Sequence, residues 1–128
     1  MAVGFPAVTG DIFTAADYNG LVAYTVNTNT SDYTAVLTDQ YQVLEIMNKA
    51  SAIAFKIPTN ASVAFPIGTV ITVLSIGIGT CTISAVTSGT TTILSSGATP
   101  AAPTLAQYRS AACIKTGTDT WYVVGAIG

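Results

Sequence analysis

Apolar and polar residues alternate with a period of two along most of the chain after Tyr33, and turn residues recur at short intervals. This pattern is typical of short β-strands in an all-β sandwich or barrel. Ile53, Phe55 and Ile57 alternate with Ala or Lys, so these three side chains are predicted to face the core. The predicted strands lie near residues 33–37, 41–47, 52–57, 69–76, 80–86, 90–94, 108–115 and 120–124.

Two of these strands suggest the core or a subunit interface. The run from Val70 to residue 74 is apolar on both sides, which predicts a strand buried on both faces by its partner sheet and by another subunit. Val70 and Val73 are therefore candidate core or interface residues. Trp121 lies in an alternating terminal strand, where the same role is favoured. The alternative for Trp121 is a sugar-stacking platform with the tyrosines at 33, 41, 108 and 122.

Residues 1–32 differ in character from residues 33–128. Thr14-Ala-Ala-Asp17 resembles a capping box and predicts a short helix from Ala15 to about residue 24. Asn27 and the polar residues up to 32 read as a linker. The chain is thus divided into an N-terminal arm with a helix, residues 1–32, and a β-module, residues 33–128.

The arm carries large apolar groups without enough neighbours to bury them, namely Phe5, Pro6, Ile12 and Phe13. Burying one such side chain fully is worth about 1.5 to 3 kcal/mol. We predict that these residues form a docking element for a larger assembly. The alternative is that the arm folds back and closes an open sheet edge.

Glycine marks the predicted turns at residues 77–79, 88–89 and 117–119. Glycine adopts backbone angles that other residues resist, and we predict that this freedom explains its use in these turns. Cys81 and Cys113 fall in strand segments and are predicted to be buried thiols. A disulfide would require neighbouring strands with Cα atoms within about 7 Å.

The amino-acid composition limits the classes of function that are expected for this chain. Charged residues make up 8% of the chain, against about 25% in a usual soluble domain, while half of the residues are hydrophobic. Such a surface suits a chain whose faces are covered by copies of itself or by a larger assembly. The four cations are scattered, so no nucleic-acid partner is expected. They are Lys49, Lys56, Arg109 and Lys115.

The remaining chemistry favours a non-enzymatic protein. There is no histidine to activate a serine, and no pair of acids has the spacing of a glycosidase site. No cofactor or metal is expected, because the acids are widely spread and two cysteines do not make a zinc site. The chain shows no signal peptide and no stretch long enough to span a bilayer, so we expect synthesis in the cytoplasm and no membrane partner.

Several motifs occur together in residues 33–126: Tyr33-Thr-Ala-Val-Leu-Thr-Asp39, Leu44-Glu-Ile-Met-Asn48, Phe65-Pro-Ile-Gly-Thr69 and Thr120-Trp-Tyr-Val-Val-Gly125. In this order they resemble a module of tailed-bacteriophage virion proteins. The resemblance implies an antiparallel β-fold that typically trimerises, found in tail fibres and in capsid decoration (cement) proteins.

The length of the chain favours the second location. A tail fibre normally needs a shaft or attachment domain, whereas only about 32 residues precede the predicted β-module. The resemblance implies a virion structural protein that trimerises, and the length favours a decoration protein on the virion capsid surface, bound to the shell of major capsid protein and stabilising it. The alternative is a tail-fibre or receptor-binding module, with a tail protein or a host surface glycan as its partner.

Overall fold

The computed structural model describes residues 14–15 and 24–128. This part of the chain is mostly β, with ten strands and one short 3-10 helix. The elements are β1 (Thr25–Asn29), β2 (Tyr33–Thr34), η1 (Leu37–Gln40), β3 (Val43–Met47), β4 (Ile53–Ile57), β5 (Val70–Ser75), β6 (Cys81–Ala85), β7 (Thr92–Ser95), β8 (Thr104–Leu105), β9 (Arg109–Gly117) and β10 (Thr120–Gly125).

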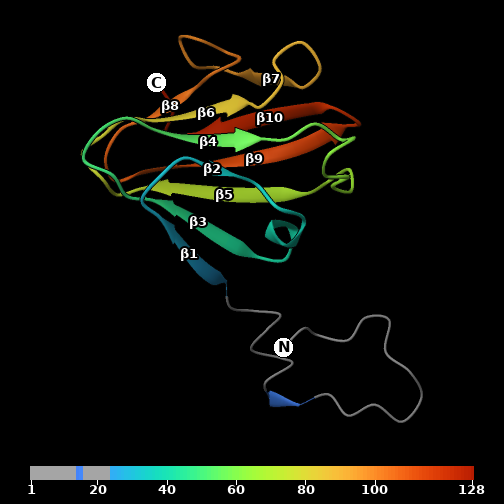
Figure 1. Cartoon of the computed structure of the whole chain (residues 1–128), viewed down its shortest axis with the longest axis horizontal. Coiled ribbons are helices and arrows are strands. Elements are labelled where there is room, and N and C mark those ends of the chain that lie inside the picture. The colour runs from blue at the N-terminus through green and yellow to red at the C-terminus, as the bar shows by residue number, and fades with distance from the viewer. Residues whose placement is uncertain (1–13, 16–23) are drawn as a thin grey trace.

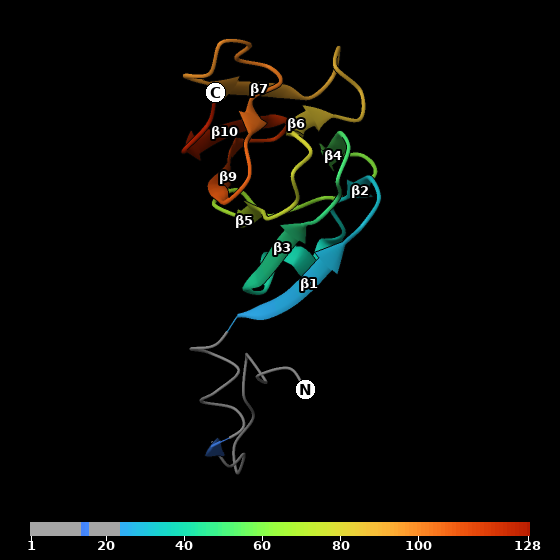
Figure 2. The same ribbon diagram turned by 90° about the vertical axis from the view of Figure 1, so that its left-hand side faces the viewer.

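The strands form two sheets, which Figure 2 shows on opposite sides of the molecule. Sheet A has the order β1-β3-β5-β9-β10-β7, and sheet B has the order β2-β4-β6-β8. From β1 to β9 the chain crosses to the other sheet after every strand (Figure 1). Successive pairs such as β1 with β2 and β3 with β4 therefore stack as coils, as in a β-solenoid. The β9–β10 hairpin ends this winding within sheet A.

The coiled path makes most of the pairings parallel. In the described part of the chain, β1 with β3, β3 with β5, β2 with β4, β4 with β6 and β10 with β7 are parallel. Only the pairings of β9 with β5 and β10, and of β6 with β8, are antiparallel. The chain is mostly β, as expected, but the expected antiparallel direction is wrong for most of the strand pairs. Strands that are neighbours in one sheet are one full coil apart along the chain and therefore run in the same direction. The sequence could not show this, because apolar and polar residues alternate with a period of two in parallel and antiparallel sheets alike.

The predicted linker is also wrong where it overlaps β1. Asn27 and Asn29 pair in register with Glu45 and Met47 of β3, so this polar segment is an edge strand. Its asparagines point toward Glu45, and their side chains donate hydrogen bonds to it. The sequence predicted a linker here because the inner face of this strand carries polar side chains, those of Asn27 and Asn29. The predicted helix lies almost wholly outside the described residues.

The core lies between the sheets. Ile53, Phe55 and Ile57 are buried, as the alternation predicted. Val73 and Trp121 are also core residues, and Trp121 packs edge-on against Phe65 with ring centroids 5.6 Å apart. Val70 is 48% exposed, so the expected burial of this strand on both faces does not occur within the chain.

The two thiols are free and buried, as predicted. Cys81 lies on β6 of sheet B and Cys113 on β9 of sheet A, both facing the core. Burial raises the pKa of Cys81 to about 11 and that of Cys113 to about 12. Both cysteines are therefore protonated, apolar core residues at neutral pH.

In the β5–β6 turn, glycine is required for close packing and not for the unusual backbone angles that were predicted. A Cβ at Gly77 would lie 2.3 Å from backbone atoms of Lys49, and one at Gly79 would lie 1.8 Å from the carbonyl oxygen of Ser51. The Gly79 amide donates to the Lys49 carbonyl oxygen over 2.9 Å. The turn thus stacks backbone on backbone against the β3–β4 turn, and the absence of a side chain is what permits this approach.

We expect Gly79→Ala to lower the free energy of unfolding by about 2 kcal/mol or more, because the added methyl group forces two turns apart. Gly89→Ala is the control, since a Cβ there meets nothing within 4 Å. It should change stability by less than about 1 kcal/mol. Urea unfolding followed by circular dichroism measures both. Equal stability of the two variants would contradict the stacking argument.

Candidate functional site

The outer face of sheet A is the most unusual surface of the described chain. Every second residue of its six strands points away from sheet B, and the strand register aligns these residues in rows across the sheet. One complete row runs Val26, Leu44, Thr72, Ala112 and Val124.

Large aliphatic side chains dominate this outer face. Val26 is 57% exposed, Val124 is 49% exposed and Tyr122 is 43% exposed. The outward residues carry no charge and only small hydroxyl groups among the apolar ones. They are Val26, Thr28, Leu44, Ile46, Val70, Thr72, Leu74, Thr92, Leu94, Ser110, Ala112, Ile114, Thr116, Thr120, Tyr122 and Val124.

Sheet B provides an internal comparison. Its outward positions hold small or polar residues, which is the usual composition of a solvated sheet face. They are Thr34, Ala54, Lys56, Thr82, Ser84 and Thr104. The two outer faces of one sandwich thus differ in character, and the face of sheet A is built for contact with another apolar surface.

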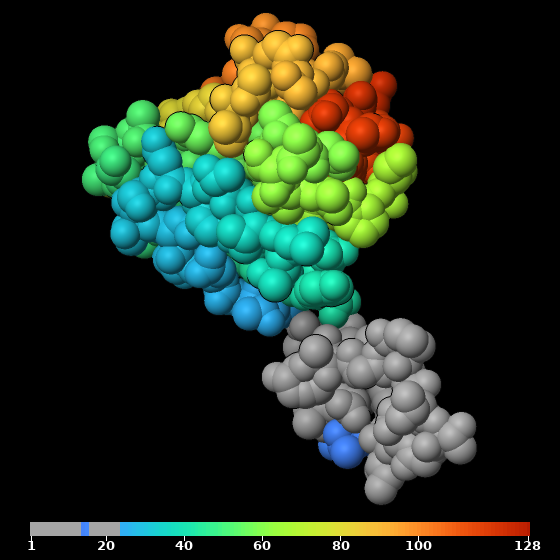
Figure 3. Space-filling view, turned by 45° about the vertical axis from the view of Figure 1, so that its right-hand side comes forward, coloured from blue at the N-terminus to red at the C-terminus, as the bar shows by residue number. Residues whose placement is uncertain are grey.

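One end of the sandwich is held by two charged residues of the β9–β10 hairpin. Lys115 is buried and donates from Nζ to the Asn60 side chain and to the Phe65 carbonyl oxygen, each over 2.7 Å. Burial lowers the pKa of Lys115, and the nearby Asp119 opposes this shift. The Asp119 carboxylate accepts hydrogen bonds from the backbone N–H of Asn60 and from the Thr91 hydroxyl. These contacts join the loops that follow β4 and β6, which lie side by side in Figure 3.

A buried acidic cluster lies between β1, β3 and η1. Glu45 is fully buried, and its Oε1 accepts from Asn27 over 2.8 Å and from Asn29 over 2.9 Å. Asp39 is 2% exposed and accepts from the Tyr33 hydroxyl over 2.8 Å and from the Val36 amide over 2.9 Å. Within the described residues, Glu45 Oε2 has no hydrogen-bond partner.

The electrostatics of this cluster favour a proton on Glu45. Burial, followed by the neighbouring Asp39, raises the pKa of Glu45 to about 7, although the two asparagines act in the opposite direction. Burial and the same carboxyl groups raise the pKa of Tyr33. Burying an ionised carboxylate without a counter-ion costs free energy. The stability of the folded chain should therefore depend on the protonation of this cluster and so on pH.

The predicted site residues are placed as follows. Phe5, Pro6, Ile12 and Phe13 lie outside the described residues. Val70 lies on the outer face of sheet A, while Val73 and Trp121 belong to the core and are unavailable for an interface.

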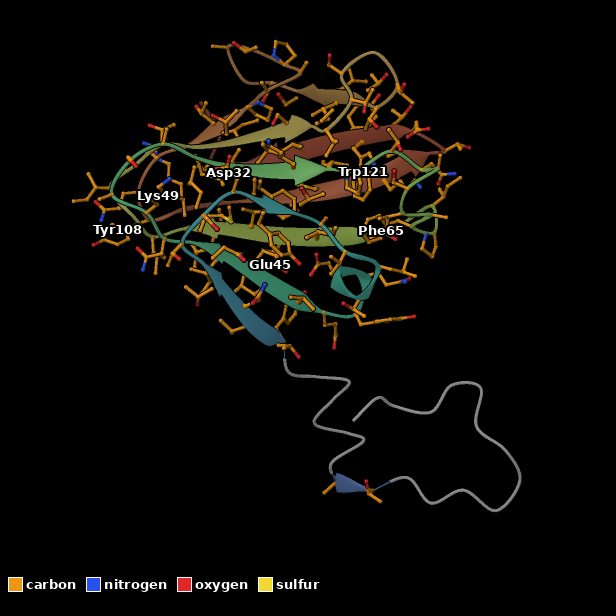
Figure 4. All side chains as sticks on the ribbon, viewed as in Figure 1. Asp32, Glu45, Lys49, Phe65, Tyr108 and Trp121 are labelled. Atoms are coloured by element: carbon orange, nitrogen blue, oxygen red, sulfur yellow. The ribbon has the colours of Figure 1, made fainter. Side chains whose placement is uncertain are left out.

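Trp121 is 1% exposed, so it cannot take the alternative role of a sugar-stacking residue. Tyr108 lies at the end of the sandwich opposite Trp121 (Figure 4), so these two side chains do not form one platform. Tyr33 is occupied by its hydrogen bond to Asp39.

Except for Val70, the sequence reading did not identify the outer face. Its signal is present in the sequence, because the outward positions of β3 are apolar and those of β5 and β10 are apolar except for Thr72 and Thr120. Collecting them into one face requires knowing that these strands share sheet A. The acidic cluster was likewise missed, since it joins residues of three elements.

Comparison of the chain with known protein families, with curated proteins and with solved structures finds no match. Among the residues that the structure describes, no helix has the length and apolar character needed to cross a membrane. The same residues contain no group of three or more acidic, cysteine or histidine side chains arranged to hold a metal ion.

We expect the free energy of unfolding to fall as pH rises from about 4.5 to 7.5. The pKa of Glu45 is about 7 in the folded chain and 4.5 for a free side chain, so the folded state holds the extra proton in this range. The stabilisation is complete below pH 4.5 and is lost as pH passes through 7, with a slope of up to about 1.4 kcal/mol per pH unit.

Glu45→Gln should abolish this slope, because glutamine keeps the Oε1 acceptor and does not titrate. Asp32→Asn is the control, since Asp32 accepts from the Ala54 amide at an exposed position and asparagine keeps that acceptor. Urea unfolding at a series of pH values measures the effect. An unchanged slope in Glu45→Gln would rule out Glu45 as its source.

Proposed function

We propose that the protein is a non-enzymatic structural subunit of a bacteriophage virion, a capsid decoration (cement) protein that binds the outer shell and stabilises it. The observation that carries the proposal is the uncharged, apolar outer face of sheet A. A face of this kind is suited to burial in a protein assembly. The resemblance of residues 33–126 to virion modules supplies the kind of assembly.

The use of the buried polar groups supports a structural role. Lys115 and Asp119 fasten loops to the β9–β10 hairpin, and Asp39 holds Tyr33 and the start of η1. Glu45 has a raised pKa, as a general acid would, but its carboxyl group is fully buried between the sheets, where a substrate has no access. These groups contribute to the architecture of the chain.

Docking to the shell is assigned to Phe5, Pro6, Ile12 and Phe13. In a trimer, three such arms would bind together, and weak contacts would add up through their high effective concentration. The β-module would then form the body of the oligomer, and its outer face would be free to serve contacts other than those with the shell.

Copy number in purified particles tests the proposal. A decoration protein should be present in hundreds of copies, comparable to the major shell protein, as measured by quantitative mass spectrometry of intact virions. A few dozen copies or fewer would instead support the tail-fibre alternative. Absence from the particles would overturn the virion proposal.

Deletion of residues 1–13 tests the docking arm. We expect the truncated protein to remain folded and oligomeric but to lose binding to capsids stripped of the decoration protein, as measured by co-sedimentation. The full-length chain is the positive control. Aggregation or misfolding of the truncated protein would show that the arm belongs to the folded body, and the docking assignment would then be wrong.

A further inference from the structure

We propose that the outer face of sheet A is covered by the same face of a second copy of this chain. This inference names the partner of that surface and rests on the proposed function only in assuming that the chain works in an assembly. The contact would bring sheet A of one copy against sheet A of another, about 10 Å apart, as stacked sheets pack in a sandwich.

Charge is the first argument for a second copy. The charged residues of the described chain lie in the interior, in loops, on sheet B or, for Arg109, at the start of β9 on the inward side of the strand alternation, and none is an outward residue of sheet A. A partner recognised by its acidic or basic groups would find nothing here to pair with. Two identical apolar faces meet without like-charge repulsion, and homodimer interfaces are more apolar than other protein interfaces.

The distribution of side chains is the second argument. Large aliphatic side chains lie on the inner strands, as Leu44, Leu74 and Ile114, and also on the edge strands, as Val26 on β1 and Leu94 on β7. The apolar surface therefore extends from one edge of the sheet to the other, as in the predominantly apolar interfaces of homodimers.

Area is the third argument. Six strands spaced about 4.8 Å apart and about five residues long, at about 3.3 Å per residue, cover a footprint of roughly 500 Å². Two such faces bury roughly 1,000 Å² together, which is the lower limit for a specific interface. We therefore expect a weak, reversible association of two copies.

Two threonines on opposite sheets provide a matched test. Thr72 on β5 and Thr82 on β6 are both half-buried and point outward, Thr72 from sheet A and Thr82 from sheet B. The full-length protein and the variants Thr72→Lys and Thr82→Lys would be compared by sedimentation velocity between about 1 and 100 µM, because interfaces below about 1,200 Å² are typical of weak complexes. Circular dichroism would confirm that each is folded.

We expect the unmodified protein and Thr82→Lys to self-associate to the same extent. Thr72→Lys should associate at least about a hundredfold more weakly, because it places like charges opposite each other in a desolvated contact. If Thr72→Lys does not fold, the isosteric pair Thr72→Val and Thr82→Val replaces it. Thr72→Val should tighten association roughly threefold or more, since a buried hydroxyl becomes a methyl group, and Thr82→Val should leave it unchanged.

A monomeric unmodified protein at 100 µM would overturn the inference, as would equal effects of matched substitutions at positions 72 and 82. These outcomes are separable from failure of the virion proposal, which depends on particle composition. If the protein is absent from virions but self-associates in a way that Thr72→Lys weakens, the inference holds and the virion proposal fails. If it is abundant in virions but its association is insensitive to Thr72→Lys, the inference is wrong and the virion proposal is unaffected.

Discussion

The architecture depends on close backbone contact between successive coils of the chain. At the turn between β5 and β6, Gly77 and Gly79 lie directly against the backbone of Lys49 and Ser51. This contact sets the spacing at which β5 follows β3 and β6 follows β4, each pair parallel and in register. Stacked coils of this kind give each sheet continuous hydrogen bonding, although the chain leaves that sheet after every strand.

The same stacking determines where polar groups are buried. Glu45 occupies an inner position of β3 where the alternation of the strand would place an apolar residue. It is accommodated because Asn27 and Asn29 of β1 donate hydrogen bonds to its Oε1, and because burial beside Asp39 raises its pKa to about 7 and so favours its neutral form. At the sheet end that carries Trp121, Lys115 is satisfied in a similar way by Asn60 and a carbonyl oxygen. Each cluster fixes a loop or edge strand that has little apolar area of its own.

The contrast between the two outer faces links this fold to its proposed use. Sheet B presents hydroxyl groups and Lys56, whereas sheet A presents Val26, Leu44 and Val124 in one row. Both faces are solvent-exposed in the isolated chain, and only the polar one is suited to remain so. The uncharged, apolar positions of the sequence are therefore collected on a single outer face, and the proposed contact between two copies would bury that face.

The sequence by itself determined that the chain is mostly β, that Ile53, Phe55 and Ile57 face the core, and that both cysteines are buried. These follow from local alternation and residue type, which do not depend on the path of the chain. Strand direction, the membership of each sheet and the packing of Trp121 against Phe65 were decided only by the tertiary structure. The period of two is identical for parallel and antiparallel strands, and an apolar outward residue becomes part of a face only when its neighbours in the sheet are known.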